Sequence, residues 1–214
     1  MVETREETVI KASIFVVLLG LITGIVYGRT DHIYRSTTAL IGLSLPLLLP
    51  RFWKPPEKLE PFVRPLYNRG TIAVLAVFIA VHVSLVNVPF TTIDLFHKEW
   101  RDADMISHFL GGLTTWLITA EILTGLNDTW FRLERKKLIL YSFIVFFALS
   151  VAWEVAEKLS ESQISFIRET PANKGRDLVM NTLGALFGLW MVEKREYPFS
   201  LRAFQLRSSE PSDT

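Results

Sequence analysis

The sequence predicts an all-α membrane protein, a bundle of about six transmembrane helices with both termini in the cytoplasm. Half of the 214 residues are hydrophobic, and the mean hydropathy is +0.29. The apolar residues gather into long runs with few charges, and runs of about 18 or more are typical of helices that cross a bilayer. The polar segments between the runs are short. We therefore expect residues 1–214 to form a single integral membrane domain.

Six segments come close to the roughly 20 residues that a bilayer core requires. In order, they are Val9–Tyr27, Ile33–Leu49, Thr71–Phe90, Met105–Leu126, Leu138–Leu159 and Leu178–Val192. The second is the least regular, because Arg35 stands near its start and Pro46 near its end, so a re-entrant or tilted segment is the alternative there. The leader before the first segment is acid-rich, unlike a signal peptide, and this predicts a retained anchor.

The distribution of Lys and Arg predicts the orientation. With the N-terminus inside, most of the 23 basic residues fall in inner segments, as the positive-inside rule requires. This predicts a multi-pass protein of the cell membrane with the lipid bilayer as its surroundings. The proline-rich residues 53–69 are expected to lie along the interface, with Trp53 and Tyr67 at headgroup level. Residues 198–214 are expected to form a disordered tail.

Composition and motifs exclude several classes of protein. The net charge of +1 comes without a basic stripe interleaved with aromatic residues, so nucleic acid is not an expected partner. The chain has no cysteine, which excludes disulfides, thiolate metal ligands and a cysteine nucleophile. There is also no nucleotide-binding loop, no nucleophile elbow and no HExxH motif, so the familiar catalytic classes have no support.

A repeated polar signature opens two of the apolar segments. DMISHFLGGL begins at Asp104, and DLVMNTLGAL begins at Asp177. A spacing of four residues places Asp104 and His108 on one helical face, and Asp177 and Asn181 on another. Ionisable groups inside a span cost free energy unless they have partners or water, so their position calls for an explanation.

Acidic residues of the fifth segment reach the same membrane level in the predicted topology. The candidate catalytic residues are therefore Asp104, His108, Glu154, Glu157, Asp177 and Asn181. Carboxylates with one imidazole are a ligand set for a divalent cation, and Mg, Mn and Zn all fit such a set. The candidate metal ligands are Asp104, His108, Glu154 and Asp177. Without a metal, the same groups could act as general acid and base, and the sequence leaves both readings open.

A purely structural interpretation is also available. Asp is a favoured N-cap, so Asp104 and Asp177 would only start two helices, and Glu154 would pair with Lys158 one turn on. The Leu-Gly-small-Leu half of each repeated motif predicts that two helices approach closely just beneath the polar half.

Other polar residues suggest further contacts. Lys174 and Arg176, in the segment before Asp177, are candidates to hold a lipid phosphate or another anionic headgroup, and a solvated loop balanced by its own acids is the alternative. For His82 we expect an interhelical hydrogen bond. Glu121 lies about 20 Å along the helix from His108 and is expected to make a second polar contact near the opposite interface, or to snorkel.

Three stretches resemble a known pattern. HFLGGL after an Asp, then WEVAEK, then RDLVMNTLGALFG look like the motifs of VanZ-like membrane proteins and the related YjdF-like family, over residues 104–188. That pattern has Asp and His at one helix head, Glu on the next helix and Asp-x3-Asn-x2-Gly on the last. The matching residues here are Asp104, His108, Glu154, Asp177, Asn181 and Gly184.

One departure narrows what the resemblance implies. VanZ-like proteins place Gln three residues after the Glu, whereas this chain has Glu157 there, as in the YjdF-like version. The departure speaks against a role in glycopeptide resistance. The resemblance implies a shared site rather than a named reaction.

Two function classes follow from these patterns. The first is a metal- or carboxylate-assisted hydrolase or transferase acting on a lipid-linked or phosphorylated substrate. The second is a non-catalytic membrane carrier, binding or assembly protein whose polar cluster locks three helices together. The sequence leaves the choice between them, the metal and the oligomeric state open.

Overall fold

The computed structural model describes residues 4–86, 101–160 and 171–194, and within these ranges the chain is helical, with no strand. The expected tail at 198–214 lies outside the described residues. In chain order the elements are α1 (Arg5–Val26), α2 (Thr30–Phe52), α3 (Glu60–Tyr67), α4 (Arg69–Ala80), the π-helical η1 (Val81–Val86), α5 (Arg101–Thr129), α6 (Arg135–Ser160) and α7 (Pro171–Lys194). The all-α prediction is confirmed.

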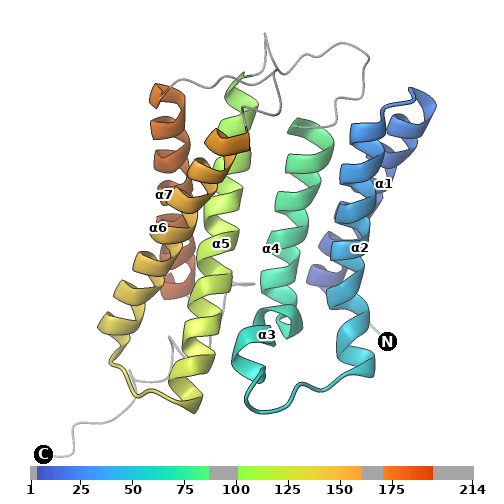
Figure 1. Ribbon diagram of the computed structural model, residues 1–214. Coiled ribbons are helices and arrows are strands. Elements are labelled where there is room, and N and C mark those ends of the chain that lie inside the picture. The colour runs from blue at the N-terminus through green and yellow to red at the C-terminus, as the bar shows by residue number, and fades with distance from the viewer. Residues whose placement is uncertain (1–3, 87–100, 161–170, 195–214) are drawn as a thin grey trace, which may run out of the picture.

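The long helices run side by side between two ends of the molecule (Figure 1). α1, α4 with η1, and α6 run upward in this view, whereas α2, α5 and α7 run downward. The start of α1 and the end of α7 therefore lie at the same end. We call the end that carries the start of α5 and α7 the upper end, and the end that carries α3 the lower end.

Two hydrophobic cores divide the bundle into halves. One core joins α1, α2 and α4 around Ile10, Leu43 and Ile72. The other joins α5, α6 and α7 around Trp116 and Phe146, with Val74 of α4 at its edge. α4 therefore links the two halves of the bundle.

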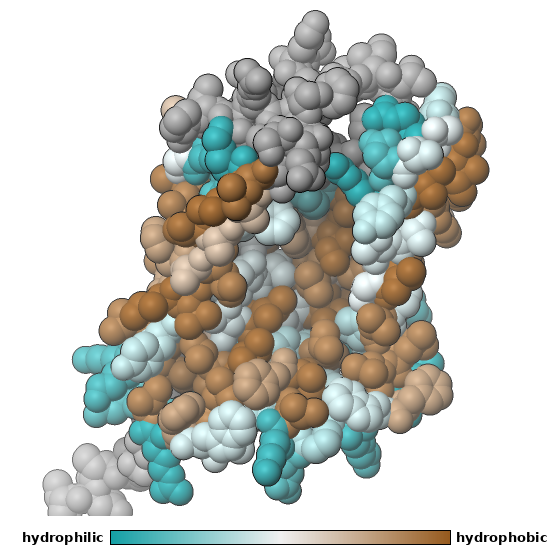
Figure 2. Space-filling view, viewed as in Figure 1, coloured by the Kyte–Doolittle hydropathy of each residue, from teal (hydrophilic) through white to brown (hydrophobic). Residues whose placement is uncertain are grey.

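The outer surface is apolar between two polar ends. Figure 2 shows hydrophobic side chains over the middle of the molecule and hydrophilic ones toward its upper and lower ends. Along α6, large side chains such as Leu140, Phe147 and Trp153 are about half exposed. An apolar exterior of this extent is expected where lipid replaces water.

Three helices are long and apolar enough to cross a membrane within the described residues: Arg5–Val26, Asp104–Thr129 and Arg135–Ala156. A fourth span is obtained if α3 and residues 69–84 count as one, although the two helices are bent by 69° at their junction. α2 and α7 fall outside this set. Membrane-type helices are thus confirmed, whereas the number six and the orientation remain predictions.

Two segments differ from the predicted boundaries. α2 is one continuous helix through Pro46 and Pro50, so no re-entrant turn forms there. α7 starts at Pro171, seven positions before the predicted segment, because its first turns are polar and a hydropathy window does not detect them. The proline-rich stretch after α2 contains α3, and the Tyr67 hydroxyl donates to the Trp53 carbonyl at 2.7 Å.

Candidate functional site

The two repeated motifs meet at the upper end of the bundle. Asp104 and His108 come from the first three turns of α5, and Asp177 comes from the second turn of α7. One ligand atom from each of the three side chains lies within 4.8 Å of the others. His108 Nε2 is 3.6 Å from Asp104 Oδ2 and 3.9 Å from Asp177 Oδ1. We call these three residues the DHD cluster.

Burial sets the cluster apart from ordinary surface acids. Asp177 is fully buried, and the side chains of His108 and Asp104 are only 12% and 19% exposed. Buried carboxylates are costly unless positive charge and hydrogen bonds surround them. Asn173 Nδ2 donates one such hydrogen bond to Asp177 Oδ2 at 3.3 Å. The imidazole of His108 lies between the two carboxylates.

The helix-capping interpretation is wrong for Asp177. α7 begins at Pro171, so Asp177 lies well inside the helix, further than the uncertainty of one or two residues in any helix boundary. Its side chain is directed at His108 of α5. Capping therefore does not explain why this carboxylate is there.

Glu154 reaches the neighbourhood of the cluster from α6. It is buried, and its Oε2 lies 3.7 Å from Lys174 Nζ on α7. Glu154 is absent from the close group of three ligand atoms, so its predicted role as a ligand remains a prediction. Glu157 also belongs to α6, but its side chain lies outside the described part of the chain.

The two cations predicted to bind an anion make contacts within the protein. Lys174 pairs with Glu154, and Arg176 Nη2 donates to Asn173 Oδ1. Asn173 in turn donates to Asp177. A chain of contacts therefore links Arg176 to a cluster carboxylate, whereas Lys174 contacts Glu154 of α6.

Asn181 lies one turn below Asp177, where α5 and α7 come closest. A Cβ added at Gly112 would overlap the backbone carbonyl of Asn181, and one added at Gly184 would overlap the carbonyl of Phe109. The predicted close approach beneath the polar residues is confirmed. The backbones of α5 and α7 touch directly there, which fixes the distance between the two halves of the cluster.

His82 makes a hydrogen bond between η1 and α5. His82 Nδ1 lies 2.7 Å from Ser107 Oγ, and Ser107 is buried and precedes His108 in the chain. The interhelical hydrogen bond expected for His82 is confirmed. No sequence signal identifies Ser107 as its partner.

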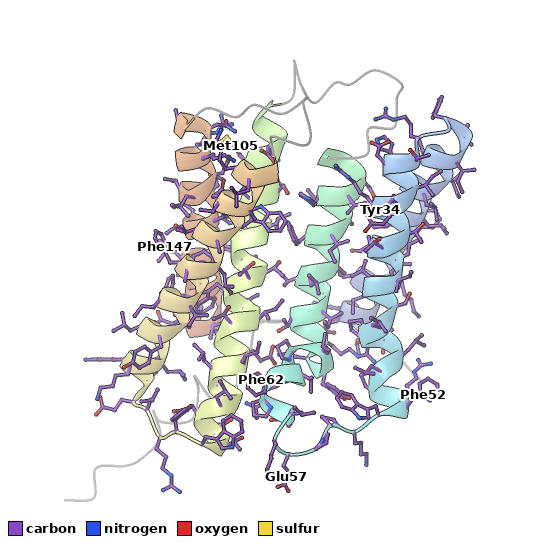
Figure 3. The ribbon with its side chains drawn as sticks, in the orientation of Figure 1. Tyr34, Phe52, Glu57, Phe62, Met105 and Phe147 are labelled. Carbon is purple, nitrogen blue, oxygen red and sulfur yellow. The ribbon has the colours of Figure 1, made fainter. Side chains whose placement is uncertain are left out.

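Figure 3 labels Met105, next to Asp104, at the upper end and Phe62 of α3 at the lower end. Glu121 forms a separate polar group at the lower end. It is buried, accepting hydrogen bonds from Asn68 Nδ2 at 2.8 Å and from Thr71 Oγ1 at 2.7 Å. The predicted second polar contact is confirmed, and snorkelling is wrong. Because Asn68 lies at the bend between α3 and α4, Glu121 fixes that bend against α5.

The side chains of the DHD cluster could hold a divalent cation. Two carboxylates and one imidazole offer oxygen and nitrogen donors within a few ångströms, a set that suits Mg, Mn or Zn. Three protein ligands leave open positions for water or substrate oxygen. The carboxylates of Asp104 and of the buried Asp177 would favour a bound cation, so the residues present fit a divalent metal.

A family model matches most of the chain. A family model described as "Predicted membrane protein (DUF2238)" covers residues 8–196. No curated protein and no solved structure matches the chain. The family match supports a membrane protein and carries no information on the resemblance to VanZ-like or YjdF-like proteins.

Proposed function

Because the chain belongs to the DUF2238 family of predicted membrane proteins, we propose that it is a multi-pass protein that binds a divalent cation near one face of the membrane. The convergence of Asp104, His108 and Asp177 within 4.8 Å supports this most strongly. Two different helices supply these donors at one level, and close backbone packing holds the helices together.

The proposed topology has six spans. In addition to the apolar helices, α2 and α7 run the same course through the bundle (Figure 1). Their polar residues face neighbouring helices: His32 and Ser36 of α2 are buried, as are Asp177 and Asn181 of α7. Inward-facing polar groups lower mean hydropathy without exposing charge to lipid. Together with the positive-inside distribution, this supports a topology with both termini in the cytoplasm and the DHD cluster at the outer face.

The reaction class that suits the site is hydrolysis or group transfer on a lipid-linked or phosphorylated substrate. A divalent cation would polarise a phosphoryl oxygen and lower the pKa of a bound water. Asp104, His108 and Asp177 would hold the ion. Arg176, which is linked to Asp177 through Asn173, and Lys174, which pairs with Glu154, would attract the anionic part of the substrate.

A second candidate function is supported by the contacts between α6 and α7. The ion pair of Glu154 and Lys174 joins these helices at the level of the cluster. In a non-catalytic carrier, binding or assembly protein, this pair and the DHD cluster would lock α5, α6 and α7 together. Stability would then depend on these residues even in the absence of a cation.

Calorimetric titration of the purified full-length chain with Mn²⁺ and Zn²⁺ tests the proposal. The wild-type chain should bind one ion, and Asp104→Asn and Asp177→Asn should lose binding, because each removes one anionic ligand at nearly constant shape. Glu193→Gln is the control, since Glu193 is an exposed acid paired with Arg135 on α6. Equal binding by wild-type and Asp177→Asn chains would refute the cation site. Loss of stability without cation binding would favour the locking role.

A further inference from the structure

A groove lies between α5 and α6 in the lower half of the bundle. It has a volume of about 360 Å³ and is lined along α5 from Thr115 to Leu126 and along α6 by Val145 and Leu149. Apart from two threonines, the lining side chains are aliphatic. The lower ends of the two helices diverge in the view of Figure 1. The DHD cluster lies at the other end of α5, so the groove is a separate feature of the molecule.

The lining residues of α5 form one stripe along that helix. Thr115, Ile118, Ile122 and Leu126 follow one another at spacings of three or four residues, which places them on one helical face. All four are half-buried, although α5 as a whole is more deeply buried than α1 or α6. The stripe is therefore the part of α5 that its neighbouring helices leave uncovered.

The position of the groove matches the depth of one lipid leaflet. At a rise of about 1.5 Å per residue, Leu126 lies about 6 Å and Thr115 about 22 Å along the axis from Trp130, which follows α5 directly. One leaflet of a hydrocarbon core of about 30 Å is about 15 Å deep. The groove thus covers the depth that the chains of a lipid in the lower leaflet would occupy.

Aromatic side chains mark the headgroup level below the groove. Trp130 is about half exposed, and its ring lies 6.0 Å from that of Phe62 on α3, which Figure 3 labels. Tyr141 is also about half exposed, and it shares a face of α6 with Val145, four residues further on. Trp and Tyr at a membrane surface typically lie among the lipid headgroups. The lower opening of the groove is therefore at the interface.

Positive charge gathers beside this lower opening, in the connection from α5 to α6 and the first turn of α6. Three cations there are exposed: Arg132, Lys136 and Lys137. Within the part of the chain that the structure describes, no carboxylate pairs with any of them, whereas Arg135 pairs with Glu193. Glu134 is the single acid of this connection, so a surplus of positive charge remains.

We propose that the groove binds one acyl chain of an anionic phospholipid whose phosphate lies against Arg132, Lys136 and Lys137. Lipid chains are as apolar as Leu, so filling the groove discriminates little between lipids by itself. The cations supply the preference, because Lys and Arg near a membrane surface attract negatively charged headgroups. The site is independent of a cation at the DHD cluster and adds a second ligand to the proposed function.

Combined Arg132→Gln, Lys136→Gln and Lys137→Gln removes the positive charge without changing the groove. The matched control is combined Arg51→Gln, Lys54→Gln and Lys58→Gln. These are also three exposed cations at the lower end, at the end of α2 and just beyond it. The control therefore removes the same charge from the same end of the molecule, away from the groove.

A second pair of variants tests the groove itself. Ile122→Trp fills the groove, because Ile122 lies in the middle of the stripe on α5. Ile144→Trp makes the same change at an exposed position of α6 outside the groove and is the control.

Native mass spectrometry of the purified full-length chain measures affinity for phosphatidylglycerol and for phosphatidylcholine with the same chains. The wild type should bind one phosphatidylglycerol more tightly than phosphatidylcholine. Loss of the three cations beside the groove should weaken this binding by at least about tenfold, since each cation near a membrane surface contributes about fivefold. The control with substitutions at Arg51, Lys54 and Lys58 should bind phosphatidylglycerol as the wild type does.

Cross-linking locates the bound chain. A phosphatidylglycerol with a diazirine in its acyl chain is incorporated into nanodiscs with the protein, and the labelled peptides are identified. Compared with a phosphatidylcholine probe, labelling should be enriched at residues 115–126 and 145–149. Ile122→Trp should abolish the enrichment, whereas Ile144→Trp should retain it. The wild-type map needs no variant, so the test holds even if Ile122→Trp does not fold.

Several results would overturn the proposal. Equal affinity for the two phospholipids, or an equal loss in the control lacking Arg51, Lys54 and Lys58, would leave no specific headgroup site. Labelling without enrichment in the groove would place the chain elsewhere. A mass of two protein chains without lipid, reduced to one by Ile122→Trp, would assign the groove to a second copy of this chain.

Discussion

The backbone carbonyl of Asn181 on α7 occupies the place where a side chain at Gly112 of α5 would begin. No atom can be added there unless the two helices separate. Because Asp104 and His108 lie on α5 and Asp177 lies on α7, the spacing of the DHD cluster depends on this contact.

Gly112→Ala should therefore destabilise the protein and weaken cation binding together. Overpacking a well-packed interface typically costs about 1–3 kcal/mol, and a clash with backbone belongs at the upper end of that range. Thermal unfolding in detergent and calorimetric titration measure the two effects. Gly42→Ala is the control, since a Cβ at Gly42 meets nothing within 4 Å. An unchanged melting temperature for Gly112→Ala would contradict the close packing.

Glu121→Ala should be more destabilising than Glu121→Gln. The alanine variant leaves the buried donors of Asn68 and Thr71 unpaired, at a cost of about 1–3 kcal/mol, whereas Gln retains one carbonyl acceptor. Denaturant or thermal unfolding gives the order of the variants. Glu193→Ala, at an exposed pair, should cost no more than about 1 kcal/mol. If Glu121→Ala were as stable as Glu193→Ala, Glu121 would not fix the α3–α4 bend.

Glu154 and Lys174 should be energetically coupled. Each side chain is mostly buried, so Glu154→Gln or Lys174→Met alone leaves the other charge without this partner. The double variant should therefore lose less unfolding free energy than the sum of the losses in the two single variants. The coupling energy in contacting pairs is about 0.5–3 kcal/mol. A double-mutant cycle of unfolding free energies measures it. Strict additivity would show that the pair does not lock α6 to α7.

Local spacing allowed the sequence to predict the membrane-type fold and the main members of the site. Asp104 and His108 share a face because they are four residues apart, and the repeated Gly motif predicts the close helix contact below them. Both features follow from the spacing of residues along one helix and need no knowledge of its neighbours. The resemblance to VanZ-like and YjdF-like proteins rested on the same residues.

Tertiary contacts account for what the sequence did not predict. The partner of Glu154 on α7 is 20 positions away in the chain, and no periodicity of the sequence relates the two positions. The early start of α7 escaped detection because its first turns are polar and are stabilised by contacts with α5 and α6. The bond between His82 and Ser107 depends on a π-helical turn, for which the sequence has no clear signal.

The dependence of the melting temperature on cation concentration tests the central claim most directly. A ligand that binds only the folded state stabilises it by about 2.7 kcal/mol at 100 times its dissociation constant. Zn²⁺ or Mn²⁺ should therefore raise the melting temperature of the wild-type chain and leave that of Asp177→Asn unchanged. An equal rise in both chains, or no rise in either, would contradict a cation site at Asp104, His108 and Asp177.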